Sequence, residues 1–191
     1  MALRPLRYRD AREWVEVRQR NHEWLRPWEP TAPVRGGRPT TSFRQMVRRY
    51  NAQARAAEAL PWVVTYDGRL AGQMTISSII WGSARMASAG YWVDLDVAGR
   101  GVTPTALALA VDHCFFTVGL HRIEVNIRPE NHASLRVVQK LGFREEGVRE
   151  RFLHIDGGWR DHISFALTVE DVPDGLLRRW RASRGTQLAP E

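Results

Sequence analysis

Between residues 98 and 103 the chain reads AGRGVT, a short segment with two glycines and one arginine. Gly99 and Gly101 permit backbone angles that other residues avoid, and they let a ligand approach the main chain closely. An apolar strand pattern ends at Leu95, and an apolar helical pattern follows the loop as far as Phe116. Together a strand, a glycine loop and a helix start present free backbone amides, which bind anions such as phosphate. The alternative is a tight turn without a ligand, because short glycine patterns also occur by chance.

The helix after this loop has clear expected ends. Thr103 is a good N-cap, and Pro104 suits the first helical position, where its missing amide is not needed. Gly119 stands where a left-handed residue would close the helix. Cys114, the single cysteine of the chain, falls on the apolar face between these ends. We therefore predict a core position for Cys114, and the sequence excludes disulfides and cysteine-rich metal sites.

Asn131 and Ser134 stand three residues apart at the expected start of another helix, which runs through Leu141 and ends at Gly142. Asparagine is a preferred N-cap, and a serine in the first turn satisfies a local amide. On the residues alone, helix capping explains both side chains.

The other elements follow from hydrophobic periodicity and turn residues. The strand at 121–128 should lie parallel to the strand before the glycine loop, because a strand-helix-strand crossover normally returns that way. A loop rich in proline, glycine and tryptophan covers 21–39, and long loops in compact domains are often functional. The remaining predicted elements are strands at 3–6, 61–66, 70–81, 143–155 and 159–168, a strand that ends at 93–95, a helix that Asp10 and Glu13 start as a capping box, and a helix from Ser42 with Gln45 three residues on.

The composition is that of a globular protein: 191 residues with 43% hydrophobic and 26% charged side chains can bury a real core. The sequence shows neither an apolar leader nor a stretch that could span a bilayer, so we expect a cytoplasmic protein that does not use a membrane. Its net charge of +7 comes from arginines spread through the chain. Because they form no single run, direct nucleic-acid binding is not expected.

Taken in order, these elements and four separated motifs resemble the Gcn5-related N-acetyltransferase (GNAT) superfamily. Ala98–Thr103 resembles the Q/R-x-x-G-x-G/A loop of that family in its central glycine and departs from it at the first and last positions. Residues Ile127–Gly147, which read IRPENHASLRVVQKLGFREEG, resemble the RimJ/RimL-type branch of ribosomal-protein N-terminal acetyltransferases. Asn21–Pro30 and Asp156–His162 resemble the same branch. The implied fold is α+β, with a mixed, mostly antiparallel central sheet of about seven strands, flanking helices and one splayed pair of parallel strands.

The resemblance implies acetyl-CoA as co-substrate and no metal. Backbone amides of Gly99–Thr103 would hold the pyrophosphate, and Arg100 would add charge. The strand end from Trp92 to Leu95 would pair its backbone with the pantetheine arm, as an added strand does. Asn131 would also bond the pantetheine. The implied cofactor-binding residues are Trp92, Val93, Leu95, Gly99, Arg100, Gly101, Val102, Thr103, Asn131 and Ser134.

The same resemblance implies that Ser134 protonates the departing CoA thiolate as a general acid. RimL-type enzymes carry a glutamate base on the sixth strand, but the alignment through Asp156 and Gly157 places Leu153 there. The candidate bases are therefore Asp94, His154 and Glu130, each with a structural alternative. Because an α-amino group has a pKa near 8, a water chain without a dedicated base would also suffice.

Trp24, Trp28 and Tyr91, with the last hairpin, are expected to form the acceptor side. The alternative for the tryptophans is that they anchor the long loop to the core. The histidines show no metal-ligand spacing, so no metal site is predicted.

These predictions describe an N-acetyltransferase that acts on the α-amino group of a protein N-terminus, possibly a ribosomal protein, in a direct ternary-complex transfer. One alternative is acetylation of a small amine such as an antibiotic or polyamine. Another is a non-catalytic protein that binds acyl-CoA or RNA. A single acetyltransferase domain is expected at 1–173, followed by a polar, basic tail at 174–191 that frays, in a monomer or homodimer.

Overall fold

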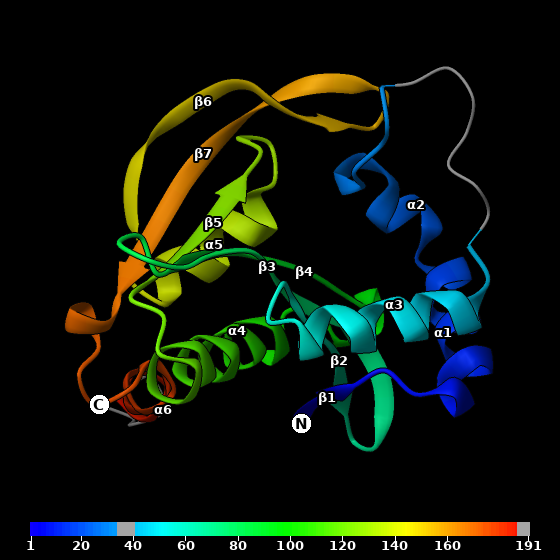
Figure 1. Cartoon of the computed structure of the whole chain (residues 1–191), viewed down its shortest axis with the longest axis horizontal. Coiled ribbons are helices and arrows are strands. Elements are labelled where there is room, and N and C mark those ends of the chain that lie inside the picture. Colours follow the sequence, from blue (N-terminus) through cyan, green and yellow to red (C-terminus); the bar gives the residue numbers. More distant parts are fainter. Residues whose placement is uncertain (34–40, 187–191) are drawn as a thin grey trace.

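The computed structural model describes residues 1–33 and 41–186 of the chain. A central sheet carries helices on both faces (Figure 1). The helices are α1 Ala11–Arg20, α2 His22–Leu25, α3 Phe43–Arg55, α4 Val102–Asp112, α5 His132–Lys140 and α6 Leu176–Thr186, and a π-helical segment, His113–Val118, extends α4. The strands are β1 Ala2–Pro5, β2 Leu60–Tyr66, β3 Arg69–Ile80, β4 Met86–Val93, β5 Arg122–Ile127, β6 Arg144–Ile155 and β7 Gly158–Thr168.

The seven strands lie in the order β1-β2-β3-β4-β5-β7-β6. All neighbouring pairs are antiparallel except β4 and β5, which the helix α4 connects as a parallel crossover. This arrangement confirms the predicted α+β fold with a mixed, mostly antiparallel sheet. The parallel pair is the feature that positions the site, since two strands that run in the same direction end at the same edge of the sheet.

Side chains of β2 show why both faces of the sheet are covered. Neighbouring residues of a strand point to opposite faces. Val63 packs with Val17, Val47 and Leu70, under α1 and α3. Val64, the next residue, belongs to the larger cluster formed with α4. A strand with two buried faces therefore needs an apolar residue at nearly every position, and β2 reads LPWVVTY.

The two predicted capping boxes have different outcomes. Ser42 and Gln45 cap α3 as expected, with Ser42 N to Gln45 Oε1 at 2.8 Å. The box at Asp10 and Glu13 is wrong: the Asp10 carboxylate accepts hydrogen bonds from Arg4 at 2.7 Å and 2.9 Å, and Glu13 accepts one from the backbone of β3 at 2.8 Å. Both acids therefore join the helix region to the sheet, which local sequence cannot reveal.

The predicted loop at 21–39 is more regular than expected. It begins with α2 and a 3-10 turn, Arg26–Trp28, and 34–40 lie outside the described residues. In Figure 1 the β6–β7 hairpin arches toward this segment. A bridge between Pro30 and Ile155 joins the two, as does the bond from Thr31 N to His154 O at 2.9 Å. Tertiary contacts with the hairpin thus order this part of the chain.

The expectation that the C-terminal tail frays is wrong for 176–186, which form α6 beside α4 (Figure 1). Asp112, at the end of α4, accepts hydrogen bonds from the amides of Leu176 at 2.6 Å and Leu177 at 3.1 Å, so it caps the start of α6. Leu176 and Trp180 are buried in the main core. Their apolar side chains hold the basic helix to the domain.

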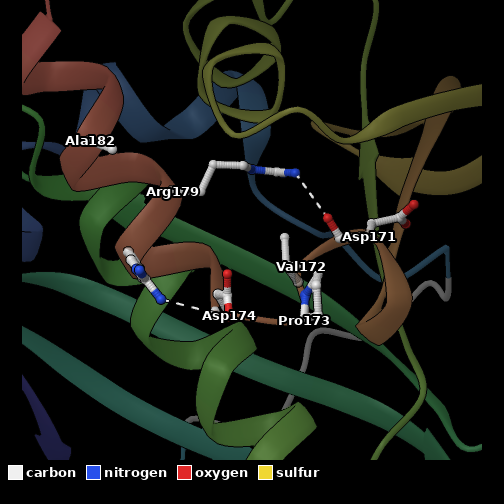
Figure 2. A pocket seen from close by; sticks show the side chains of 8 residues that line it. Asp171, Val172, Pro173, Asp174, Arg179 and Ala182 are labelled. Atoms are coloured by element: carbon white, nitrogen blue, oxygen red, sulfur yellow. Dashed lines mark hydrogen bonds and ion pairs between the residues drawn. The ribbon is translucent and has the colours of Figure 1, made fainter.

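A small cavity of about 300 Å³ lies at the start of α6. Figure 2 shows the side chains that line it. Arg179 points across it and donates to the backbone oxygen of Asp171 at 3.3 Å. On its other side Arg178 lies 3.6 Å from the Asp174 carboxylate. None of the residues predicted for the site lines this cavity, and its charged groups serve the α6 junction.

Candidate functional site

A second, larger cavity of about 770 Å³ lies where β4 and β5 separate. The two strands pair from Met86 and Arg122 as far as Ser88 and Glu124, and the pairing stops there although both strands continue. Residues 88–92 of β4 and 125–128 at the end of β5 line the opening. The splayed parallel pair is therefore present as expected. Backbone groups on its facing edges are available to an extended ligand that adds itself as a strand.

Other elements close the cavity around this fork. Trp14 and Arg18 come from α1, residues 28–30 follow α2, and Met46 and Tyr50 come from α3. The last hairpin contributes Leu153, Ile155 and His162. The cavity thus joins the predicted cofactor side, at β4, to the predicted acceptor side, at α2 and the hairpin.

Tyr91 and Ser134 meet inside this cavity. The Tyr91 hydroxyl lies 2.7 Å from Ser134 Oγ, across 43 positions of sequence. Asn131 accepts a hydrogen bond from the Ser134 amide at 3.1 Å and so caps α5 as predicted. Burial raises the pKa of Tyr91 more than the Ser134 bond lowers it. Tyr91 therefore stays protonated at neutral pH, and the pair holds a proton beside the fork.

The glycine loop lies at the N-terminus of α4. Gly99 and Gly101 both have φ of +79°, in the left-handed region that glycine tolerates best. Gly101 is the N-cap, so the predicted N-cap role of Thr103 is wrong: Thr103 and Pro104 are the second and third residues of the helix. The reason is that the left-handed Gly101 turns the chain directly into the helix, which therefore begins at Val102. Pro104 still needs no amide partner in the first turn.

One residue near the loop was missed by sequence reasoning. A Cβ atom placed on Gly101 would lie 3.2 Å from Nη1 of Arg184, so this guanidinium from α6 reaches the loop. The Arg184 guanidinium carbon lies 5.8 Å from the centre of the Trp180 ring, which supports its orientation. Trp180 is itself held in place, because its indole nitrogen donates to Thr105 Oγ1 at 2.9 Å. Arg184 therefore adds to the positive charge of Arg100 at the helix start.

Asp94, a predicted catalytic candidate, does not line the cavity. Its buried carboxylate forms an ion pair with Arg20 and accepts a hydrogen bond from Asn21 Nδ2 at 2.8 Å. Burial alone would raise the pKa of Asp94, but these bonds outweigh burial and hold that pKa below its usual value. The carboxylate joins the end of α1 to the end of β4.

His154 and Glu130 also lie outside the cavity lining. His154 Nδ1 is 2.7 Å from Thr31 Oγ1, and its ring packs edge-on against Trp159. Glu130 is exposed and accepts a hydrogen bond from Arg128 Nε at 3.2 Å. Leu153, at the position where the resemblance expects a glutamate, does line the cavity and carries no ionisable group. The structure therefore does not bring the three base candidates to the fork.

The two tryptophans have different positions. Trp28 lines the cavity, with the Arg128 guanidinium 5.3 Å from the centre of its ring. Trp24 does not line it and donates instead to the Val93 backbone oxygen at 3.3 Å. Trp24 thus anchors the segment after α1, which was the alternative given for the tryptophans, whereas Trp28 lines the cavity on the side where the acceptor is expected.

The strand β4 ends within the predicted range of 93–95. It ends at Val93, and Leu95 begins a 3-10 turn, Leu95–Val97. The Leu95 amide donates to Asn21 Oδ1 at 2.9 Å. Because this amide and the Val93 oxygen are bonded within the protein, residues 89–92 are the part of β4 that faces the fork.

A forked parallel pair, a left-handed glycine loop at a helix start and a proton-holding pair beside the fork define an acyltransferase site. In agreement, residues 1–144 match the family described as "Acetyltransferase (GNAT) domain". The chain belongs to the GNAT acetyltransferase family. It is an N-acetyltransferase, as the sequence predicted, and the alternative of a non-catalytic binding protein is not supported.

Individual relatives agree with the RimJ/RimL-type resemblance. A probable N-acetyltransferase of Bacillus subtilis, YjcK, is 31% identical over 88% of this chain and 94% of its own length. The ribosomal protein uS5-alanine N-acetyltransferase of Escherichia coli K12 is 29% identical over 92% of this chain and 91% of its own. The solved structure of Mycobacterium smegmatis RimJ in complex with CoA-disulfide is 41% identical, with a TM-score of 0.89, over 95% of this chain and 88% of that one.

The described part of the chain has neither a metal-binding cluster nor a membrane-spanning helix. Within 1–33 and 41–186, no group of three or more His, Cys, Asp or Glu side chains is placed to hold a metal ion. In the same ranges, every helix is too short or too polar to cross a bilayer.

Proposed function

We propose that the protein transfers the acetyl group of acetyl-CoA to the α-amino group of a protein N-terminus, with a ribosomal protein as the acceptor class. The observation that carries the proposal is the fork cavity, because one continuous space connects the free edge of β4 with the Tyr91–Ser134 pair and the acceptor side at Trp28. Similarity over most of the chain to the uS5-alanine enzyme and to CoA-bound RimJ supports the donor and the acceptor.

The residues of the chain fit acetyl-CoA. A Cβ on Gly99 would meet no described atom within 4 Å, so the loop leaves room for a phosphate beside the amides that begin α4. Arg100 and Arg184 supply charge there, and residues 89–92 supply the edge for the pantetheine. Acetyl-CoA supplies the activated acetyl thioester. The chain binds it, orients it in the fork, and provides the proton that the departing sulfur needs.

Replacing Arg184 by alanine should weaken acetyl-CoA binding about fivefold, because an exposed guanidinium beside a phosphate adds a modest, salt-screened attraction. Titration calorimetry at low and at physiological salt would measure the change. Arg181→Ala is the matched control, since Arg181 is an exposed arginine on the same helix. Equal weakening in both variants would mean that only the overall charge of α6 matters and that Arg184 has no special place.

The charges of the cavity favour a peptide over a polyamine acceptor. Its ionised lining groups are Arg18, Glu29 and Arg128, two cations to one carboxylate, and Glu29 is already paired with Arg18. A polycation would find no free carboxylate among them. A peptide N-terminus carries one amine and several carbonyl oxygens, which guanidinium groups can bond.

A direct assay tests this proposal. Acetyl-CoA should raise the melting temperature of the protein, since a ligand that binds only the folded state stabilises it. CoA thiol should then be released with peptides that carry the N-terminal residues of ribosomal proteins, and more slowly with spermidine. Suppose that acetyl-CoA stabilises the protein, that no peptide leads to release of CoA thiol, and that spermidine leads to rapid release. The small-amine alternative would then be correct. The proposal is overturned if acetyl-CoA does not stabilise the protein and no CoA thiol is released with any acceptor.

A further inference from the structure

His162, on β7, lines the fork cavity although it is only 3% exposed. It lies opposite Arg149 of β6, and the next residue, Ile163, pairs with Ile127 at the end of β5. Its ring packs edge-on against Phe152, with 5.9 Å between ring centres. The imidazole is therefore fixed by packing at the acceptor side of the opening between β4 and β5.

One hydrogen bond sets the tautomer of this ring. His162 Nδ1 lies 3.0 Å from the backbone oxygen of Arg160. A carbonyl oxygen only accepts, so Nδ1 carries the proton and Nε2 keeps its lone pair. Among the described residues nothing donates to Nε2, and no buried side-chain nitrogen there is both sealed from solvent and without a partner. Nε2 is therefore not sealed in the core, and the space next to the ring is the cavity that His162 lines.

Burial, with the nearby Arg128, keeps the ring neutral. Burial lowers the pKa of His162 below its usual value, the bond to Arg160 opposes this, and the nearby Arg128 lowers that pKa further. Asp161 on the same strand and Glu130 in the β5–α5 loop raise it by less. From β6, Arg149 also faces this position, and its guanidinium is paired with Glu124 at 2.9 Å. At neutral pH the ring is a base without a proton on Nε2.

The other ionisable groups of the lining differ from His162. Arg18 and Arg128 are permanent cations, and the Glu29 carboxylate is half-exposed and forms an ion pair with Arg18. Tyr91 keeps its proton and is bonded to Ser134. Of the ionisable side chains that line the cavity, His162 is the buried one that carries an unprotonated ring nitrogen.

We propose that Nε2 of His162 accepts the proton that the acceptor amine loses as it attacks the acetyl carbon. This inference rests on the proposed function. The neutral amine nitrogen forms a bond to the acetyl carbon and gives one proton to Nε2, while the carbon–sulfur bond breaks and the sulfur takes one proton from Ser134. Solvent in the cavity returns the His162 proton to Ser134, directly or through the Tyr91 hydroxyl that is bonded to it, so that Tyr91 also keeps its proton at the end. Nitrogen thus loses one proton, sulfur gains one, and both residues end as they began.

Replacing His162 by asparagine tests this role, because an asparagine amide can still donate to the Arg160 oxygen but has no basic nitrogen. With saturating acetyl-CoA and an N-terminal peptide, we expect kcat at pH 7 to fall about 100-fold, within the usual range for general-base catalysis, and KM for acetyl-CoA to stay unchanged. In the wild type, kcat should decline as pH falls through the lowered pKa of the imidazole. The variant should lack that decline, and imidazole added to His162→Gly should restore turnover.

His121→Asn is the matched control, since His121 lies outside the cavity and pairs with exposed Glu170. If His162→Asn is unfolded by circular dichroism, His162→Gln replaces it in every comparison. Turnover within threefold of wild type would overturn the inference, as would a loss that keeps the wild-type pH profile and that imidazole does not restore. If the wild type itself releases no CoA thiol, the proposed function fails first and the inference fails with it.

Discussion

Ser134→Ala should lower kcat about 100-fold while the affinity for acetyl-CoA stays within about twofold of wild type. Ser134 lies at the first turn of α5 with its hydroxyl 2.7 Å from that of Tyr91. A thiolate leaves more easily when it takes a proton as the bond to carbon breaks. Tyr91, kept protonated by burial, can replace the proton that Ser134 gives. Without the serine oxygen this path is cut, whereas the amides that bind the cofactor remain.

Stopped-flow measurement of CoA thiol release gives kcat, and calorimetry gives the affinity. Ser134→Thr keeps a hydroxyl at the same place and should retain most of the turnover. Tyr91→Phe should have a smaller effect than Ser134→Ala, because solvent can partly replace the second donor. Unchanged kcat in Ser134→Ala would remove the serine from the reaction and leave it with the role of a helix residue next to the Asn131 cap.

The parts of the site that were predictable are those set by local chemistry. Gly99 and Gly101 were found because left-handed backbone angles favour glycine, and Asn131 because a helix start needs a side-chain acceptor. The crossover rule made β4 and β5 parallel, whereas their splaying into a fork was implied by the family resemblance. Each of these features depends on residues that are close in sequence.

Asp94 and Trp24 show where such reasoning ends. Both stand beside residues that do face the site, but their partners lie about 70 positions away: Asp94 bonds Arg20 and Asn21, and Trp24 bonds Val93. Nothing in the local pattern says that these side chains serve the junction between α1 and β4. Capping rules failed at Thr103 for a related reason, because the loop geometry made Gly101 the cap.

His162 and Arg184 were missed for opposite reasons. The alternation of β7 did contain a signal, since a polar residue precedes the partly buried Ile163 and points to the other face, but the strand alone does not say that a cavity lies there. Arg184 stands in a segment that reads as a basic tail. Only the packing of Trp180 brings it to Gly101.

Asp94→Ala should lower the free energy of unfolding by about 2 to 3 kcal/mol, below the usual range for breaking a buried ion pair because the Arg20 partner is partly exposed. The change leaves Asn21 Nδ2 with only its bond to the Val17 backbone oxygen, so one of its two hydrogens loses its acceptor in a buried position. Since the pKa of Asp94 is lowered in the folded state, the unfolded chain binds its proton at the higher pH. The contribution is therefore complete above the ordinary carboxyl pKa of about 3.9 and is lost as pH falls through the folded value.

Urea unfolding at pH 7 and at pH 3 separates this role from catalysis. The difference between wild type and Asp94→Ala should be large at pH 7 and should shrink at pH 3. Asp96→Ala is the matched control, because Asp96 is exposed and lies 3.8 Å from the same Arg20. At temperatures where the variant is folded, its kcat should keep the acid decline that we assign to His162. If Asp94→Ala instead keeps the wild-type free energy of unfolding but its kcat no longer declines at acid pH, Asp94 is the base. A carboxylate with only a structural role could not change the pH profile of kcat without also weakening the fold.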